Sequence, residues 1–146
     1  MKAAVVVANE DVQYLEIPEP EAKPGYVKIK VHYSGICGSD IPRVLHNGVH
    51  FYPIVLGHEF SGDVVEIGEG VTKVKAGDRV SGAPLVPCMK CEDCQKGNYS
   101  LCKHYSFIGS REQGAMQIMW WFRSRTQFLL THQFPMSRAQ CSSPLQ

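Results

Sequence analysis

The sequence lacks an excess of charge of either sign, a long apolar run and an export signal. Fifteen Lys and Arg residues nearly balance fourteen Asp and Glu residues, and the net charge of +1 gives no reason to expect a nucleic acid or an acidic surface as partner. No apolar run approaches the roughly 20 residues of a membrane span. The first residues have neither the length nor the cleavage site of a signal peptide. We therefore expect a cytoplasmic protein without a membrane or nucleic-acid partner.

Helical periodicity is also scarce. Only residues 39–46 look helical, for about two turns. Apolar and polar residues alternate at 27–31, which is typical of a half-buried strand. Residues 63–68 read as a second strand, and residues 75–80 as a turn into a third. The 146 residues, with 13 Gly placed between these segments, suit one domain with a modest core. The pattern predicts a small, mainly β, tightly turning barrel.

The cysteines provide the most informative pattern. Four of the six lie close together, with gaps of two, two and seven residues: Cys88, Cys91, Cys94 and Cys102. Four thiolates at such spacing can close a tetrahedral shell around one zinc ion. Disulfides are one alternative, but nothing else indicates export. An iron–sulfur cluster is another, but its usual bacterial run ends in a shorter gap followed by Pro. We predict a structural zinc in a lobe at residues 87–104 that holds the loop together and does no chemistry.

A second possible metal centre is spread over two segments. Cys37 lies in G-I-C-G-S-D after one strand, and His58 and Glu59 lie in G-H-E after an apolar run. A thiolate, an imidazole and a carboxylate at strand ends could form an open zinc site. Asp40 could accept the other imidazole N–H of His58, and Ser39 could pass a proton towards solvent. Taken alone, such residues are more often a buried thiol and a hydrogen-bonded imidazole.

The ordered combination of motifs resembles the zinc-dependent medium-chain dehydrogenase (zinc-containing alcohol dehydrogenase) family. G-x-C-G-S-D, G-H-E and the cysteine quartet occur in that order, with E-x-G-x-G-V at Glu66 and K-x-G-D-R-V at Lys75 between them. H-F-Y-P at His50 and F-I-G-S-R at Phe107 are similar to the branch of sorbitol and galactitol-1-phosphate 5-dehydrogenases. The resemblance runs from residue 1 to about residue 115.

The resemblance implies a GroES-like, partly open β-barrel at residues 1–115 that carries a structural and a catalytic zinc. In such enzymes Cys37 and His58 would bind the catalytic zinc, with Glu59 at or beside it, while Ser39 and Asp40 assist. The family oxidises a secondary alcohol to a ketone by hydride transfer to NAD(P), which a following Rossmann domain binds. The implied substrate is a polyol or a polyol phosphate, and relatives are oligomeric. His46 and His50 could approach the substrate, although solvated loop histidines are the simpler interpretation.

The sequence changes character after Ala115. All fourteen acidic residues lie at or before Glu112, and residues 116–146 contain both Trp residues and no Val. If the nucleotides of this segment are read one position early, Met116-Gln117 must encode Ala, and residues 119–122 must encode Val-Val-Val. These residues resemble the family's next strand, A-x-Y-V-V-V-P. We therefore predict that residues 116–146 are an irregular, non-native tail produced by a frameshift.

Two further motifs of the family are missing from these 146 residues. No G-x-G-x-x-G occurs, so the Rossmann domain is absent and the fragment is not expected to bind NAD(P). The G-A-x-x-E-P segment, whose carboxylate the family places near the catalytic zinc, is absent as well. We predict that this chain alone is inactive as a dehydrogenase. The alternative function is a stand-alone GroES-like zinc-binding module without redox activity.

Overall fold

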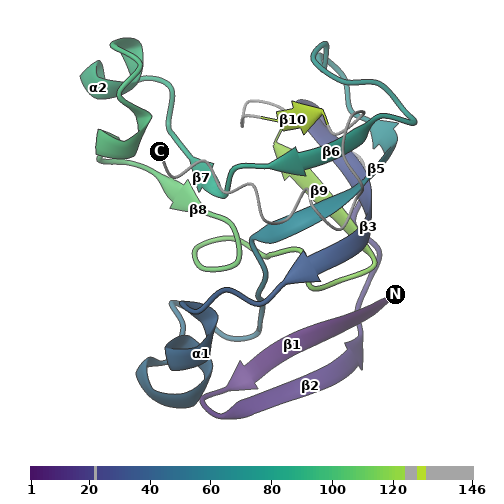
Figure 1. Ribbon diagram of the computed structural model, residues 1–146, viewed down its shortest axis with the longest axis vertical. Coiled ribbons are helices and arrows are strands. Elements are labelled where there is room, and N and C mark those ends of the chain that lie inside the picture. Colours follow the sequence, from purple (N-terminus) through teal and green to yellow (C-terminus); the bar gives the residue numbers. More distant parts are fainter. Residues whose placement is uncertain (22, 124–127, 131–146) are drawn as a thin grey trace.

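The computed structural model describes residues 1–21, 23–123 and 128–130, which form short, mostly antiparallel strands (Figure 1). The first sheet has the order β2-β1-β4 and contains β1 (Lys2–Ala8), β2 (Asp11–Glu16) and β4 (Ile54–Val55). The second sheet has the order β10-β6-β5-β3-β9 and contains β3 (Tyr26–Gly35), β5 (Glu59–Ile67), β6 (Arg79–Gly82), β9 (Met119–Arg123) and β10 (Phe128–Leu130). A two-stranded sheet pairs β7 (Leu85–Val86) with β8 (Ser106–Phe107).

Helical structure is limited to short turns. α1 (Asp40–Pro42) continues directly into a π-helical turn, η1 (Arg43–Asn47), which confirms the helix predicted at residues 39–46. α2 (Glu92–Gln95) and a 3₁₀ turn, η2 (Tyr99–Leu101), lie in a lobe that projects from the barrel (Figure 1). The predicted mainly β architecture is thus confirmed.

β3 and β5 form the centre of the molecule. Val27 and Ile29 of β3 are fully buried and pack with Val64 of β5 in the main core. Lys28, between them, instead pairs with carboxylates on the surface, so the alternation predicted at residues 27–31 is confirmed. The two strands are antiparallel, and their register places Gly35 opposite Glu59. The end of β3 and the start of β5 therefore lie at the same edge of the sheet.

Part of the segment predicted to be irregular forms a strand. Residues 119–123 are β9, which adds to the free edge of β3, with Trp120 opposite Ile29. The Trp120 ring lies 5.0 Å from the rings of both Phe60 and Phe122, and all three side chains are buried. The strand forms because β3 offers an unpaired edge and these large side chains complete the core. Residues 124–127 and 131–146 of the predicted tail lie outside the described residues.

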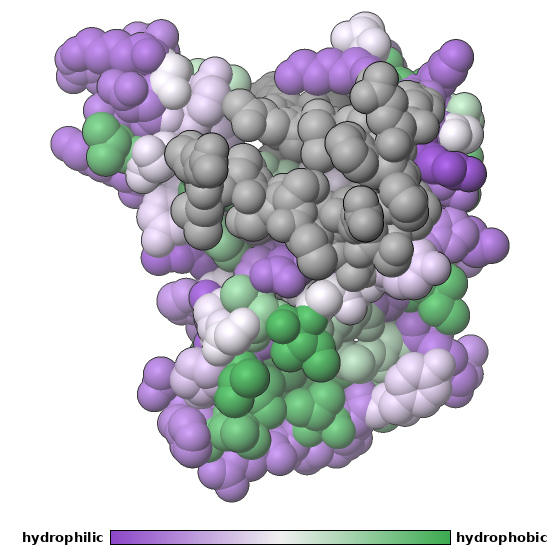
Figure 2. Space-filling model, viewed as in Figure 1, coloured by the Kyte–Doolittle hydropathy of each residue, from purple (hydrophilic) through white to green (hydrophobic). Residues whose placement is uncertain are grey.

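The surface carries apolar side chains near α1. Ile36, Ile41 and Leu45 are 74%, 53% and 43% exposed. Figure 2 shows apolar residues gathered on the lower part of the viewed face, around α1 and the β1–β2 hairpin. Among the described residues, no helix is both long enough and apolar enough to cross a membrane.

Candidate metal centres

The first candidate centre lies where β3 ends and β5 begins. Cys37 follows β3 by two residues, while His58 and Glu59 lie at the start of β5. Gly57 has a φ of +93°, a backbone conformation that side chains rarely adopt, and a Cβ there would lie 2.7 Å from Met116 Cγ. The tight turn at Gly57 thus directs the chain into β5 with His58 beside the β3 end.

These elements bring the three predicted ligands together. One ligand atom each from Cys37, His58 and Glu59 lies within 4.8 Å of the others. His58 is buried, while Cys37 and Glu59 are half-buried. Gly35 leaves the space that the carboxylate occupies, because a Cβ at Gly35 would lie 2.7 Å from Glu59 Oε2. The sulfur, nitrogen and oxygen donors suit zinc, and their partial exposure leaves room for a further ligand.

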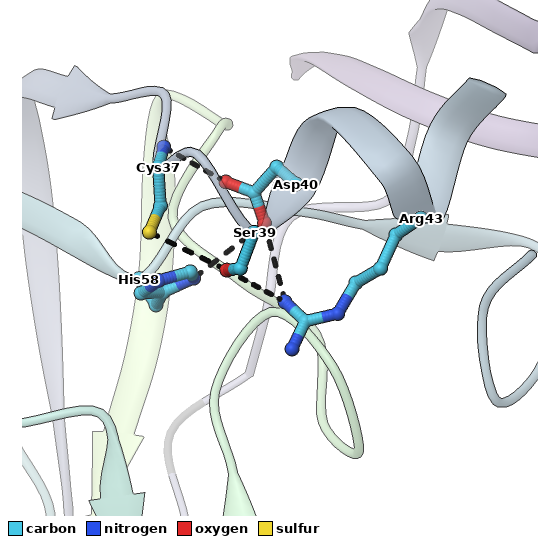
Figure 3. Close-up of polar contacts among 5 residues, drawn as sticks. All are labelled: Cys37, Ser39, Asp40, Arg43 and His58. Atoms are coloured by element: carbon cyan, nitrogen blue, oxygen red, sulfur yellow. Dashed lines mark hydrogen bonds and ion pairs between the residues drawn. The ribbon is translucent and has the colours of Figure 1, made fainter. Parts of the chain in front are cut away.

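Asp40 lies beside His58, as predicted, but the contact differs in detail (Figure 3). Asp40 Oδ1 is 3.6 Å from His58 Nδ1, which is longer than a hydrogen bond, and Nδ1 has no hydrogen-bond partner among the described residues. The other carboxylate oxygen of Asp40 accepts the backbone N–H of Cys37 at 3.1 Å. Asp40 therefore fixes the Cys37 loop and presents an acceptor on the Nδ1 side of the imidazole, which leaves Nε2 for a metal.

Ser39 and Arg43 complete the cluster. Ser39 is exposed, and its hydroxyl donates to Cys37 Sγ at 3.3 Å. Arg43 Nη1 donates to Ser39 Oγ at 3.3 Å and lies 3.4 Å from Asp40 Oδ1. Arg43 was not among the site residues predicted from the sequence. The signal was its position, three and four residues after Asp40 and Ser39 in a predicted helix, which puts it on their face.

Phe107 was identified only as part of a motif, but it contacts the site directly. Its ring meets that of His58 edge-on, with centroids 5.5 Å apart. It belongs to β8, which follows the cysteine lobe, so the F-I-G-S-R segment returns the chain from the lobe to this centre. By contrast, His46 and His50 are both exposed.

The second candidate centre is the cysteine quartet. One sulfur from each of Cys88, Cys91, Cys94 and Cys102 lies within 4.8 Å of the others. Cys94 lies in α2 and Cys102 follows η2, so the two helical turns fold the loop back on itself. Cys94 and Cys102 are buried, and the Cys88 N–H donates to Cys102 Sγ at 3.3 Å. Four convergent sulfurs fit a closed tetrahedral zinc site.

The thiols of the quartet have unequal pKa values. Backbone N–H groups of Lys90 and Cys91 donate to Cys88 Sγ at 3.5 and 3.4 Å. These hydrogen bonds lower the pKa of Cys88 to about 6. Burial raises the pKa of Cys94 to about 12.

We predict that this inequality governs thiol reactivity in the first moments after a chelator removes the zinc, while the lobe still keeps its fold. At pH 7, Cys88 is mostly thiolate, so iodoacetamide should label it first and Cys94 last, because the thiolate is the nucleophile. Below pH 6 the Cys88 rate should fall as its thiolate is protonated. Peptide mass spectrometry after timed labelling measures both rates. Equal labelling rates at Cys88 and Cys94 would contradict the unequal pKa values. The zinc-loaded chain is the control, because both thiols should be protected in it.

A second prediction concerns the space beside Glu59. Gly35→Ala should displace the Glu59 carboxylate and weaken metal binding at the Cys37 centre by about 10- to 100-fold, as is typical when the support of a ligand is changed. Gly38→Ala is the matched control, because a Cβ there meets nothing within 4 Å. Cobalt titration followed by visible absorption measures the affinity. If both variants bind cobalt as tightly as the wild type, Glu59 does not contribute to the centre.

Comparison with known proteins places this geometry in a family. Residues 23–131 match the family model of the alcohol dehydrogenase GroES-like domain. Galactitol 1-phosphate 5-dehydrogenase of Escherichia coli K12 is 40% identical over 146 residues, which cover 99% of this chain and 42% of that protein. Sorbitol dehydrogenase of Halalkalibacterium halodurans is 42% identical over 118 residues, covering 79% of this chain and 34% of that protein.

Solved structures give the same result. The crystal structure of galactitol-1-phosphate dehydrogenase from Escherichia coli matches 96% of this chain and 41% of its own, with a TM-score of 0.89 and 40% identity. A zinc-binding dehydrogenase from Sinorhizobium meliloti 1021, solved with NADP, matches 96% of this chain and 41% of its own, with a TM-score of 0.84 and 30% identity. The chain thus spans 42% of the length of the first of these curated relatives. It belongs to the zinc-dependent medium-chain dehydrogenase family, in which it corresponds to the GroES-like domain.

Proposed function

We propose that this domain supplies the metal-binding half of a dehydrogenase that interconverts a secondary alcohol of a polyol, or polyol phosphate, and a ketone. The observation that carries the proposal is the convergence of Cys37, His58 and Glu59 within 4.8 Å. The chemistry of these donors favours a catalytic rather than a closed structural zinc site, because three protein ligands leave one position open. The quartet would hold a second, structural zinc.

The residues of the Cys37 centre have distinct roles in this proposal. A zinc ion held there would act as a Lewis acid that lowers the pKa of a substrate hydroxyl. Cys37, His58 and Glu59 hold and orient the site. Asp40, 3.6 Å from His58 Nδ1, keeps the imidazole turned so that Nε2 faces the ligand position. Phe107 packs against the same ring and excludes water from one side of it.

Ser39 is placed to move the proton. Its hydroxyl lies 3.3 Å from Cys37 Sγ and is exposed on its other side. It would accept the proton of the substrate hydroxyl and release one to solvent, because a hydroxyl both donates and accepts. Hydride would pass to NAD(P) on the remaining part of a full-length enzyme.

Cobalt binding tests the proposed centre in the 146-residue chain. We expect two binding steps, one at the thiolate-rich quartet and one with a single thiolate ligand. Cys37→Ser should remove the second step and leave the first unchanged, whereas Cys91→Ser should do the reverse. A single cobalt-binding step that Cys37→Ser does not alter would contradict the proposed catalytic centre. Only the structural site would then bind metal, as expected of a GroES-like module without redox activity.

We also propose that the chain from residue 116 onward results from a frameshift, and that without it the gene continues into a cofactor-binding domain. The shifted frame would replace Trp120, Trp121 and Phe122 by three Val residues, so both frames provide apolar residues for β9. Sequencing the genomic DNA from codon 105 past the stop codon tests this. A product with the frame restored should oxidise polyols with NAD(P), and the present chain should bind zinc but not NADH. If the DNA shows no continuing open frame with a G-x-G-x-x-G, this proposal fails.

The proposed location is the cytoplasm. Among the described residues all five cysteines are free thiols: Cys37, Cys88, Cys91, Cys94 and Cys102. Free thiols at metal-ligand spacing are typical of a reducing compartment. For the full-length enzyme we expect an oligomer with a small-molecule substrate.

A further inference from the structure

Arg43 lies next to the Cys37 centre without belonging to its ligand set (Figure 3). It is the first residue of η1, which follows α1 without a break, so Arg43 lies about one helical turn after Ser39 and Asp40. Its Nη1 donates to Ser39 Oγ at 3.3 Å, and Ser39 Oγ lies 3.3 Å from Cys37 Sγ. Two successive short contacts therefore connect the positive charge of Arg43 to a proposed metal ligand.

The guanidinium of Arg43 has donors to spare. Both of its polar contacts use Nη1. In the part of the chain that the structure describes, its Nε and Nη2 have no protein partner, and Figure 3 shows the second terminal nitrogen pointing away from Ser39 and Asp40. The side chain is 28% exposed, so a ligand can reach it. A guanidinium presents five N–H groups in a planar fork that matches a phosphate.

The charges around the centre show what such a fork would bind. The anionic ligands Cys37 and Glu59 would offset the charge of a divalent ion, so the metal site itself would attract a phosphate only weakly. The carboxylate of Asp40 is 3% exposed and already partnered by the Cys37 N–H and by Arg43. A neutral polyol would gain little from the free side of Arg43, whereas a phosphate monoester would gain charge-assisted, bidentate hydrogen bonds.

We infer that Arg43 binds the phosphate of a polyol-phosphate substrate whose reacting hydroxyl lies at the Cys37–His58–Glu59 centre. This inference rests on the proposed function and makes it narrower, because it selects the phosphorylated substrate. Arg43 is then a specificity residue. It fixes one end of the substrate while Ser39, which it holds by a hydrogen bond, faces the other.

Binding measurements on the cobalt-loaded 146-residue chain test the inference. The probes are a hexitol phosphate, the matching free hexitol, inorganic phosphate and ADP-ribose, with ³¹P relaxation reporting proximity to the paramagnetic ion. Arg43→Gln should weaken binding of the hexitol phosphate about 10- to 100-fold, as expected for lost hydrogen bonds to a charged group. Binding of the free hexitol should not change. Arg43→Lys keeps the charge but loses the planar fork. Its affinity for hexitol phosphate should therefore lie between those of the wild type and Arg43→Gln.

The controls separate the possible outcomes. Arg79→Gln removes the same charge from an exposed position on β6, and it should leave the affinity for hexitol phosphate as it is. Equal losses of hexitol-phosphate affinity in Arg43→Gln and Arg79→Gln would overturn the inference alone. The same holds if Arg43→Gln loses no affinity while the cobalt spectrum of the Cys37 centre is intact. A loss confined to ADP-ribose would assign Arg43 to the cofactor, and a loss confined to inorganic phosphate would mean that it binds a free anion; either would overturn the inference. Absence of the cobalt centre itself would overturn both the inference and the proposed function.

Discussion

Trp120→Ala is expected to lower the free energy of unfolding by about 3–5 kcal/mol, a large share of the stability of a domain of this size. The Trp120 side chain is 5% exposed and packs between Phe60 and Phe122 in the main core. Its indole N–H also donates to the carbonyl of Gln113 at 3.1 Å. Truncation would leave a large cavity and an unpaired carbonyl, and the surrounding strands can fill the space only in part. Denaturant unfolding of zinc-loaded protein measures the change.

Trp121→Phe is the matched control for that experiment. Trp121 is the next residue of β9 and is also buried, but within the part of the chain that the structure describes its indole nitrogen has no hydrogen-bond partner. The change therefore removes little volume and no hydrogen bond, and we expect a loss below about 1.5 kcal/mol. If Trp120→Ala costs no more than this control, β9 does not form part of the core, and the domain ends before it.

Cys94→Ser is expected to remove one zinc per chain and to unfold the lobe at residues 87–104. The lobe contains only the short turns α2 and η2, which are too short to be stable alone. A structural zinc provides on the order of 10 kcal/mol of folding free energy in comparable small metal-binding peptides. Ser cannot replace the buried sulfur of Cys94, so the closed shell would open. Limited proteolysis should then cleave within the lobe, and the zinc content should fall.

Cys37→Ser serves as the control for the lobe. It should also cost one zinc per chain, but it should leave the lobe resistant to protease, because Cys37 lies at the end of β3 rather than in the lobe. A Cys94→Ser protein that keeps both its metal content and its resistance would show that the quartet does not bind zinc.

Different kinds of pattern in the sequence predicted different parts of the structure. The strand at residues 27–31 could be predicted because one buried face produces a local alternation. The quartet could be predicted because its four ligands lie on one loop, so that spacing alone limits their geometry. The cluster of Cys37 with His58 and Glu59 depends on the register that places Gly35 opposite Glu59. No local pattern reveals that register. The positions of the three residues at predicted strand ends only made a metal site possible, and the family resemblance selected it over the simpler interpretation.

The structure differs from the prediction at residues 119–122, where packing against the other strands determines the conformation. Residues 119–122 lack the alternation of a half-buried strand, because Trp120, Trp121 and Phe122 are all buried. Their assignment to β9 depends on the unpaired edge of β3, which the sequence of this segment does not encode. Arg43 was missed for a different reason, because its helical spacing from Ser39 and Asp40 was present in the sequence but was not used. That spacing puts Arg43 on the same helical face as Ser39 and Asp40.

The zinc content of the purified wild-type chain tests the account most directly. After gel filtration without added metal, inductively coupled plasma mass spectrometry should give two zinc ions per chain, one at the cysteine quartet and one at the Cys37–His58–Glu59 centre. One zinc ion that is lost in Cys94→Ser and kept in Cys37→Ser would contradict the proposed catalytic centre, and a zinc-free, folded chain would contradict both sites.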